Sequence, residues 1–272
     1  MAILTSQQIN ELYEKYSNID VTFTKEINDF LRLERNQIFL KFKDEQRPCI
    51  IYSSSMVEAK IIVALSLEKI KSLKDDNLAT LRFSFFKEKR TDILSFYVQA
   101  RIEGLTQYDK ERNLYCARLK FTRKPPDDLI EILGNLLEAN INAARRKDER
   151  ITINKNSLQR LGITSQGAVV LIERVPRKAL IHDISFGGIE LIVLGNPKFL
   201  QDKYVVIKIS LASGQSIILK GKIVRVENVP GQKGIVSLGI KLDEDSVGYE
   251  YKTMINDYLR YARKAPGLKN NI

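Results

Sequence analysis

Two short polar stretches decide the fold: Arg146-Lys147-Asp148-Glu149-Arg150 and, further along, Asp183-Ile184-Ser185-Phe186-Gly187-Gly188. The first has the spacing RxxxR and leads directly into the apolar run Ile151-Thr152-Ile153. The second has the spacing DxSxxG and lies between two segments that alternate like strands. Each pattern is common alone. Both together, in this order and with strand-like sequence between them, predict one composite site.

The arginine run suits a ligand that carries phosphates and guanine rings. A guanidinium group can donate two parallel hydrogen bonds to a phosphate or to the O6/N7 edge of guanine, and it can stack on a base. The ammonium group of lysine does neither as well. The RxxxR spacing places Arg146 and Arg150 on one side of a helical turn, or of a loop that wraps a ligand.

The DxSxxG run supplies complementary groups. The carboxylate of Asp183 can accept hydrogen bonds from the N1 and N2 edge of guanine, which arginine cannot do. Ser185 offers a compact donor for phosphate. Gly187 and Gly188 are expected to turn the chain with positive φ and to let it approach the ligand closely.

Simpler interpretations exist for each run alone. An RxxxR run is a weak signal in a chain with 44 lysines and arginines. Arg150 can pair with Asp148 or Glu149 on a wet surface and contribute little. The DxSxxG run by itself can be an ordinary Asx-type turn in a hairpin.

Together the two runs resemble the ligand signature of PilZ domains, small β-barrels that bind the bacterial messenger cyclic di-GMP. All five motif positions match. The resemblance implies that Arg146 and Arg150 grip phosphate and guanine, that Asp183 and Ser185 complete the pocket, and that Gly188 shapes the turn. The cyclic di-GMP site that we expect consists of Arg145, Arg146, Arg150, Asp183, Ser185, Gly187 and Gly188.

The residue before the RxxxR run bears on stoichiometry. In the family, an arginine at the position of Arg145 accompanies two intercalated ligand molecules, and an apolar residue accompanies one. Both stoichiometries stay open here. Over its whole length the chain resembles two-domain PilZ receptors of the spirochaetal type, in which a split barrel precedes the PilZ domain. The resemblance implies a ligand and no cofactor.

Composition narrows the class of protein. A length of 272 residues can hold two small domains, each with its own core. Cys49 and Cys116 lie far apart and have no metal-ligand spacing, and the single histidine, His182, argues against a metal site or a catalytic triad. We find no paired general acid and base, so we expect no enzyme. With no secretory pattern and no long apolar run, we expect a cytoplasmic protein without membrane insertion.

Positive charge is concentrated in the second half. Residues 1–144 contain 22 Lys+Arg and 21 Asp+Glu, whereas residues 145–272 contain 22 and 12. This excess suits an anionic ligand, but it also suits nucleic acid. A nucleic-acid-binding regulator is therefore the alternative function, supported by tyrosines close to basic side chains; the other interpretation of these tyrosines is a core face. The residues concerned are Tyr249, Tyr251, Tyr258 and Tyr261, near Lys252, Arg260, Arg263 and Lys264.

The hydrophobic pattern predicts a mainly β fold with two PilZ-like or split β-barrels, each followed by a C-terminal helix. In the first half we expect strands at 37–42, 49–53, 59–65, 79–86, 93–102 and 114–121. In the second half we expect them at 151–153, 168–173, 179–183, 189–193, 204–211, 216–226 and 235–242. A leading helix begins at a capping box of Thr5 and Gln8. Further helices are expected at 127–144, after Pro125-Pro126, and at 248–264.

These elements predict a degenerate PilZ-like domain at 1–144 and a PilZ domain at 145–272, with 141–150 as the ligand-binding linker. The two halves are interpretable as a divergent duplication, because IYSSSMVEAKI (51–61) can be laid on IHDISFGGIEL (181–191). Ser55 then falls on Ser185, but Ser53 replaces the aspartate and Glu58 the last glycine. The first half has therefore lost the pocket. The alternative is that small β-barrels share general features.

The position of the arginines suggests a mechanism. The RxxxR run lies in the connection between the domains, whereas Asp183 and Ser185 lie on the barrel. We hypothesise that the ligand ties the connection to the barrel, reorients the halves and changes a partner surface. The partner itself stays open between a flagellar or other regulatory protein and nucleic acid.

Overall fold

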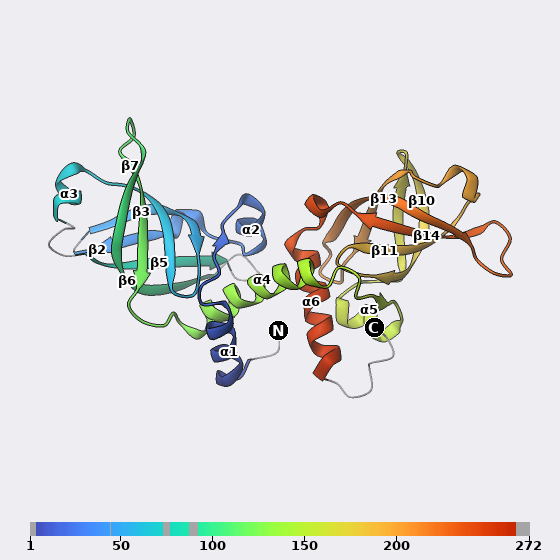
Figure 1. Ribbon diagram of the computed structural model, residues 1–272, viewed down its shortest axis with the longest axis horizontal. Helices are drawn as coiled ribbons and strands as arrows, with labels where there is room; N and C mark the ends of the chain where they lie inside the picture. Colours follow the sequence, from blue (N-terminus) through green and yellow to red (C-terminus); the bar gives the residue numbers. More distant parts are fainter. Residues whose placement is uncertain (1–3, 44, 73–76, 87–91, 265–272) are drawn as a thin grey trace. The chain divides into compact units, whose positions relative to one another are not determined.

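Two β-barrels, each followed by a helix, make up the chain (Figure 1). The computed structural model describes residues 4–43, 45–72, 77–86 and 92–264. It divides into two compact units, Met1–Leu137 and Glu138–Ile272. Helix α4 (Asp127–Arg145) follows the first barrel and continues into the second unit, and α6 (Tyr249–Lys264) follows the second barrel. The predicted fold class is confirmed.

The first barrel is a closed ring of antiparallel strands in the order β3-β2-β5-β6-β7-β4, closed by the pairing of β3 with β4, while β1 lies beside β3. Burial alternates along the strands, as in β4, where Ala59, Ile61 and Val63 point into the core. The strand bounds are β1 Val21–Thr22, β2 Phe39–Phe42, β3 Glu45–Ser54, β4 Glu58–Ala64, β5 Leu78–Phe86, β6 Ile93–Asp109 and β7 Leu114–Phe121.

The second barrel repeats the first. Its ring runs β10-β9-β12-β13-β14-β11 and closes through β10 and β11, with β8 beside β10. A bulge follows Ile51 in β3 and, at the matching place, Ile181 in β10. Ile51 faces Ile61 as Ile181 faces Leu191, so strand order and register support the duplication. The bounds are β8 Ile151–Thr152, β9 Gly167–Ile172, β10 Val175–Ile184, β11 Gly188–Leu194, β12 Tyr204–Ser210, β13 Ser216–Asn228 and β14 Ile235–Leu242.

Helix α1 (Ser6–Tyr16) begins at the predicted capping box. The Thr5 hydroxyl accepts a hydrogen bond from the Gln8 N–H, and the Gln8 side chain accepts one from the Thr5 N–H at 3.0 Å. Several helices were not predicted, because pieces this short cannot show a periodic apolar stripe. They are α2 (Lys25–Phe30), α3 (Leu67–Ser72), α5 (Lys155–Leu161), η1 (Arg35–Gln37), η2 (Pro197–Phe199) and η3 (Glu244–Ser246).

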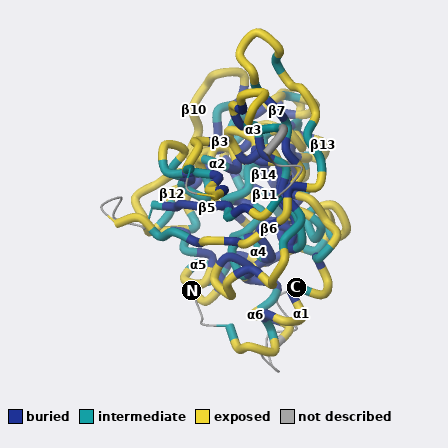
Figure 2. Tube along the Cα trace, turned by 90° about the vertical axis from the view of Figure 1, so that its left-hand side faces the viewer, coloured by how far each residue is buried: buried dark blue, intermediate teal, exposed yellow. Residues whose placement is uncertain are grey.

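The core of the second unit extends from the barrel onto α6. Tyr251, Ile255 and Leu259 are buried in the same hydrophobic cluster as the inward strand residues. Figure 2 shows buried residues along the strands and exposed ones at the loop tips. Burial of each such side chain stabilises the fold by about 1.5–3 kcal/mol, so α6 is held firmly against the barrel. None of the described helices combines the length and the apolar character that a bilayer crossing requires.

Candidate ligand-binding site

The two polar runs meet at one corner of the second barrel. The Gly187 N–H donates a hydrogen bond to the Lys147 carbonyl at 3.1 Å. The short strand β8 pairs with β10 so that Thr152 lies opposite Asp183. Arg150 immediately precedes β8 and is thereby placed beside Asp183. The backbone itself therefore joins the RxxxR run to the DxSxxG turn, as the composite site requires.

Arg150 and Asp183 form an ion pair at this corner. Arg150 Nη1 donates to Asp183 Oδ1 at 2.9 Å and to Oδ2 at 3.1 Å, and it lies 3.4 Å from Glu190 Oε2. The Asp183 side chain is 10% exposed and that of Arg150 is 47% exposed. Within the described residues, every one of these contacts uses Nη1. The Nε–Nη2 edge of Arg150 is thus available for two parallel hydrogen bonds to guanine or phosphate.

Glu190 is a member of this corner that sequence reasoning missed. Its carboxylate accepts hydrogen bonds from Arg225 Nη2 at 2.9 Å and from Ser237 Oγ at 2.5 Å. These residues come from β11, β13 and β14, so no local spacing links them. One feature of the sequence could have indicated Glu190: it is a charged residue in an otherwise apolar strand, two residues after Gly188.

A histidine also joins the carboxylates. His182 Nδ1 lies 3.5 Å from Asp183 Oδ2 and 3.9 Å from Glu190 Oε1. One ligand atom from each of these three residues lies within 4.8 Å of the others, an arrangement that can hold a metal ion. Arg150 and Arg225 already direct positive charge at the same carboxylates. A cation would have to displace them, so the donor set favours ion pairing over metal binding.

Ser185 closes the turn of the DxSxxG run. Its hydroxyl accepts a hydrogen bond from the Gly188 N–H at 3.0 Å and donates one to the Gly188 carbonyl at 3.2 Å. The side chain is buried. The hydroxyl is therefore used within the turn, and it is not the free phosphate donor that the sequence suggested.

The glycines of the turn serve close packing. The expectation of positive φ at Gly187 and Gly188 is wrong, because the glycines with positive φ lie elsewhere. A Cβ on Gly188 would lie 3.0 Å from the Ile240 carbonyl oxygen, and one on Gly187 would lie 3.3 Å from that of Lys147. These residues therefore allow the turn to contact β14 and the RxxxR run.

Helix α6 supports the turn from the core. The Tyr251 hydroxyl donates a hydrogen bond to the Ser185 carbonyl at 2.8 Å, and the tyrosine is fully buried. Burial, and secondarily the charge of Asp183, raises the pKa of Tyr251, so the phenol keeps the proton that it donates. Because this hydrogen bond is buried, it holds the DxSxxG turn in one position relative to α6.

The remaining arginines of the expected site lie on the run that leads to the corner. Arg145 is exposed at the end of α4. Arg146 Nη1 lies 3.6 Å from Glu149 Oε2, and Glu149 also accepts a hydrogen bond from Arg263 at 3.1 Å. The structure thus joins Arg150 to the turn residues, whereas among the described residues neither Arg145 nor Arg146 contacts Asp183.

Lys147 fixes the other side of the run. Its ammonium group pairs with the carboxylate of Glu244, in η3. The hydrogen bond from Lys147 lowers the pKa of Glu244. Together with the Lys147 carbonyl that accepts from Gly187, this pair attaches the run to the barrel at two points.

The matching corner of the first barrel has the opposite polarity. Asp20 precedes β1 as Arg150 precedes β8, and it accepts hydrogen bonds from Lys60 Nζ at 3.1 Å and from Ser53 Oγ at 3.4 Å. By register, Lys60 takes the place of Glu190 and Ser53 that of Asp183. The corner therefore presents a carboxylate where an anionic ligand needs arginine, which supports the expected loss of the pocket.

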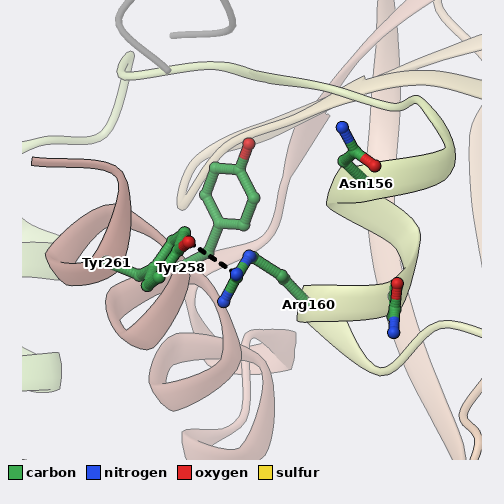
Figure 3. A pocket seen from close by; sticks show the side chains of 5 residues that line it. Asn156, Arg160, Tyr258 and Tyr261 are labelled. Carbon is green, nitrogen blue, oxygen red and sulfur yellow. Dashed lines mark hydrogen bonds between the residues drawn. The ribbon is translucent and has the colours of Figure 1, made fainter. Parts of the chain in front are cut away.

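Two of the four tyrosines that suggested nucleic-acid binding lie in the core, and an arginine covers the ring of a third. Tyr251 and Tyr258 are buried in the core. The Arg160 guanidinium group lies over the Tyr261 ring, 3.3 Å from its centroid, and donates to its hydroxyl at 2.5 Å. Figure 3 shows this pair in a hollow of about 510 Å³ between α5 and α6. The core interpretation thus holds for the two buried residues.

Comparison with known proteins places both halves in related families. Residues 7–140 match the PilZN3 domain, and residues 144–260 match the PilZ domain. A cyclic di-GMP binding protein of Treponema denticola is 39% identical over 267 residues, which cover 97% of this chain and 85% of that protein.

Solved structures give a further likeness. The Borreliella burgdorferi PlzA protein in complex with c-di-GMP is 25% identical, with a TM-score of 0.42, over 94% of this chain and 99% of that one. The K. pneumonia MrkH–c-di-GMP complex is 14% identical, with a TM-score of 0.31, over 96% and 97% of the two chains.

Proposed function

The chain belongs to the PilZ family, and we propose on this basis that it is a cyclic di-GMP receptor whose second barrel holds the ligand. The observation that carries the proposal is the corner where Arg150, paired to Asp183 through Nη1 alone, keeps its Nε–Nη2 edge available. A relative that is 39% identical over nearly the whole chain bears the name of a cyclic di-GMP binding protein.

The corner offers complementary groups for both parts of the ligand. The free edge of Arg150 can hold the O6/N7 edge of one guanine or a phosphate oxygen pair. Asp183 keeps lone pairs beyond those that Arg150 uses, and these can accept from guanine N1 and N2. Arg145 and Arg146 then supply charge to the phosphates from the preceding turn. Gly187 and Gly188 add no side chain that would keep the ligand away.

The arrangement suits recognition more than catalysis. Asp183 and Glu190, the carboxylates of the corner, are held by Arg150 and Arg225. A carboxylate in such a pair is oriented as a fixed acceptor, which favours specific binding. We therefore propose a receptor that releases its ligand unchanged. Chromatography of cyclic di-GMP after incubation with the protein checks this point, since linear products would contradict it.

Ligand binding has a route to the rest of the chain. The expected linker, 141–150, begins within α4, which ends at Arg145. A ligand that engages both the arginines of the RxxxR run and the Asp183 turn would add a further attachment between the end of α4 and the barrel, beyond those that Lys147 provides. We propose that this changes the arrangement of the two units and thereby a surface for a regulatory protein partner. Small-angle scattering with and without saturating ligand tests the rearrangement, and superimposable profiles would exclude it.

Guanine specificity provides the direct test of the binding mode. Isothermal titration with cyclic di-GMP and with cyclic di-AMP should show a strong preference for the guanine ligand. Asp183→Ala should reduce this preference, because the acceptor for N1 and N2 is removed. Equal binding of both dinucleotides by the unmodified protein would contradict the proposed site.

A further inference from the structure

The backbone of the RxxxR run places Arg146 and Glu149 side by side. The Glu149 N–H donates a hydrogen bond to the Arg146 carbonyl at 3.2 Å, which closes a four-residue turn directly after α4. Across this turn, Arg146 Nη1 lies 3.6 Å from Glu149 Oε2. One arginine of the RxxxR run therefore faces a carboxylate of the same run, and this carboxylate is not a member of the expected site.

A second arginine holds the same carboxylate from α6. Arg263 Nη2 donates to Glu149 Oε1 at 3.2 Å and to Oε2 at 3.1 Å. Arg263 lies in the last turn of α6, next to Ala262, which is buried in the core cluster of the second unit. Because α6 is packed on the barrel, Arg263 is a fixed anchor for Glu149, whereas Arg146 belongs to the connection that follows α4.

The two ion pairs of Glu149 differ in strength. The contacts with Arg263 have hydrogen-bond distances, whereas the 3.6 Å to Arg146 is too long for a hydrogen bond. Both arginines are more than one-third exposed, and ion pairs at such positions are weak. Arg146 is therefore the partner that exchanges Glu149 for another anion more readily, while Glu149 stays with Arg263.

A ligand phosphate held by Arg146 would lie close to Glu149. A phosphate oxygen about 3 Å from Arg146 Nη1 would lie at most about 7 Å from Glu149 Oε2. This separation is shorter than the Debye length, which is about 8 Å at physiological salt. Glu149 thus opposes binding in two ways: it pairs with Arg146, which must leave it to hold the phosphate, and it repels the phosphate in the complex.

We propose that Glu149 is a built-in competitor of the ligand that sets the affinity of the site, and that Arg263 neutralises Glu149 once the ligand holds Arg146. This role rests on the proposed function, because it requires that Arg146 contacts a ligand phosphate. Glu149 and Arg263 are positioning residues that act through Arg146 and need not touch the ligand. Arg150 differs in this respect, since its counterion Asp183 is itself a residue of the expected site.

Titration calorimetry with cyclic di-GMP on the full chain tests this role through changes of opposite sign. Glu149→Gln frees Arg146 and removes the repulsion, so it should bind about three- to fivefold more tightly. Arg263→Gln leaves the charge of Glu149 to oppose the bound ligand, and it should bind about three- to fivefold more weakly. In the Glu149→Gln background, Arg263→Gln should change the affinity by less than about twofold, because no carboxylate remains to be neutralised.

Asp148→Asn is the matched control for net charge. It removes the same charge from the neighbouring residue, which is exposed and forms no ion pair within the part of the chain that the structure describes, and it should change the affinity by less than about twofold. A gain in Asp148→Asn equal to that in Glu149→Gln would overturn the proposed role, because net charge alone would then explain both.

Three other results would also contradict it. Unchanged or weaker binding by Glu149→Gln would do so, because a carboxylate that only holds the turn in place would lose affinity on substitution. An equal loss from Arg263→Gln in both backgrounds would show that Arg263 acts on the ligand directly. Absence of binding by the unmodified protein would refute the receptor proposal together with this role. Normal binding that Glu149→Gln leaves unchanged would refute the role of Glu149 alone, because the Arg150–Asp183 corner is untouched.

Discussion

Replacement of Arg150 by alanine tests the geometry of the corner most sharply. Arg150 holds Asp183 through Nη1 at 2.9 and 3.1 Å, and in the proposed site its Nε–Nη2 edge binds the ligand. In the proposed binding mode, the variant loses two charge-assisted hydrogen bonds to cyclic di-GMP. Because such bonds contribute about 1.5–3 kcal/mol each and water replaces part of the loss, we expect affinity to fall by about 2–4 kcal/mol. This corresponds to a roughly 30- to 1000-fold higher Kd.

The effect on stability should be much smaller. The Arg150 side chain is nearly half exposed, so solvent already screens its pair with Asp183. Its removal leaves the less exposed Asp183 carboxylate with one fewer donor, at a cost of about 1 kcal/mol in the free energy of unfolding. Urea unfolding of the variant measures this change in the free energy of unfolding. A large loss of affinity with a small loss of stability distinguishes ligand recognition from a structural role.

Two further variants complete the experiment. Arg150→Lys keeps the charge but not the planar fork, and it should bind about tenfold more weakly than the unmodified protein. Arg177→Ala removes an exposed arginine of the same domain that donates to the Leu194 carbonyl, and it should bind normally. Titration calorimetry provides all four affinities. If Arg150→Ala binds within threefold of the unmodified protein, the assigned role of the free edge is refuted.

Three other predictions concern the supports of the fold. Tyr251→Phe leaves the buried Ser185 carbonyl without its donor and should destabilise the second unit by about 1–2 kcal/mol in urea unfolding; an unchanged midpoint would contradict this. Gly188→Ala places a Cβ 3.0 Å from the Ile240 oxygen, so it should weaken both ligand binding and the pairing of β11 with β14, measured by titration and hydrogen exchange. Burial raises the pKa of Cys49 to about 12 from 9.0. The thiol of the unfolded chain therefore ionises at lower pH than the folded one, and the free energy of unfolding should fall as pH rises from 9.0 towards about 12. In a Cys116→Ser variant at pH 8, iodoacetamide should label Cys49 only when the protein unfolds.

The elements that the sequence predicted well are those with long periodic patterns. The leading helix began at its capping box, Thr5 and Gln8, because both partners lie within one turn and need no tertiary context. The apolar alternation of the strands predicted both barrels. The short helices such as α5 were not predicted, since a seven-residue segment lacks a readable apolar stripe.

The residues of the candidate site that lie in the two sequence motifs were predictable, whereas those brought together only by strand pairing were not. Asp183 and Arg150 lie in motifs, and the pairing of β8 with β10 brings them together. Glu190, Arg225 and Ser237 meet through the pairings of β11, β14 and β13, and no spacing in the sequence reports such register. The conformation of Gly187 and Gly188 was mispredicted for a similar reason. Glycine is required there because neighbouring carbonyl groups leave little room for a Cβ, and not because the backbone has a positive φ.

Determination of the structure of the full chain with bound cyclic di-GMP tests the central claim most directly. We predict that a guanine or phosphate of the ligand accepts from the Nε–Nη2 edge of Arg150, while Asp183 remains paired through Nη1 and faces a guanine N1–H. Ligand density elsewhere on the chain, with the Arg150 edge still facing solvent, would contradict the account.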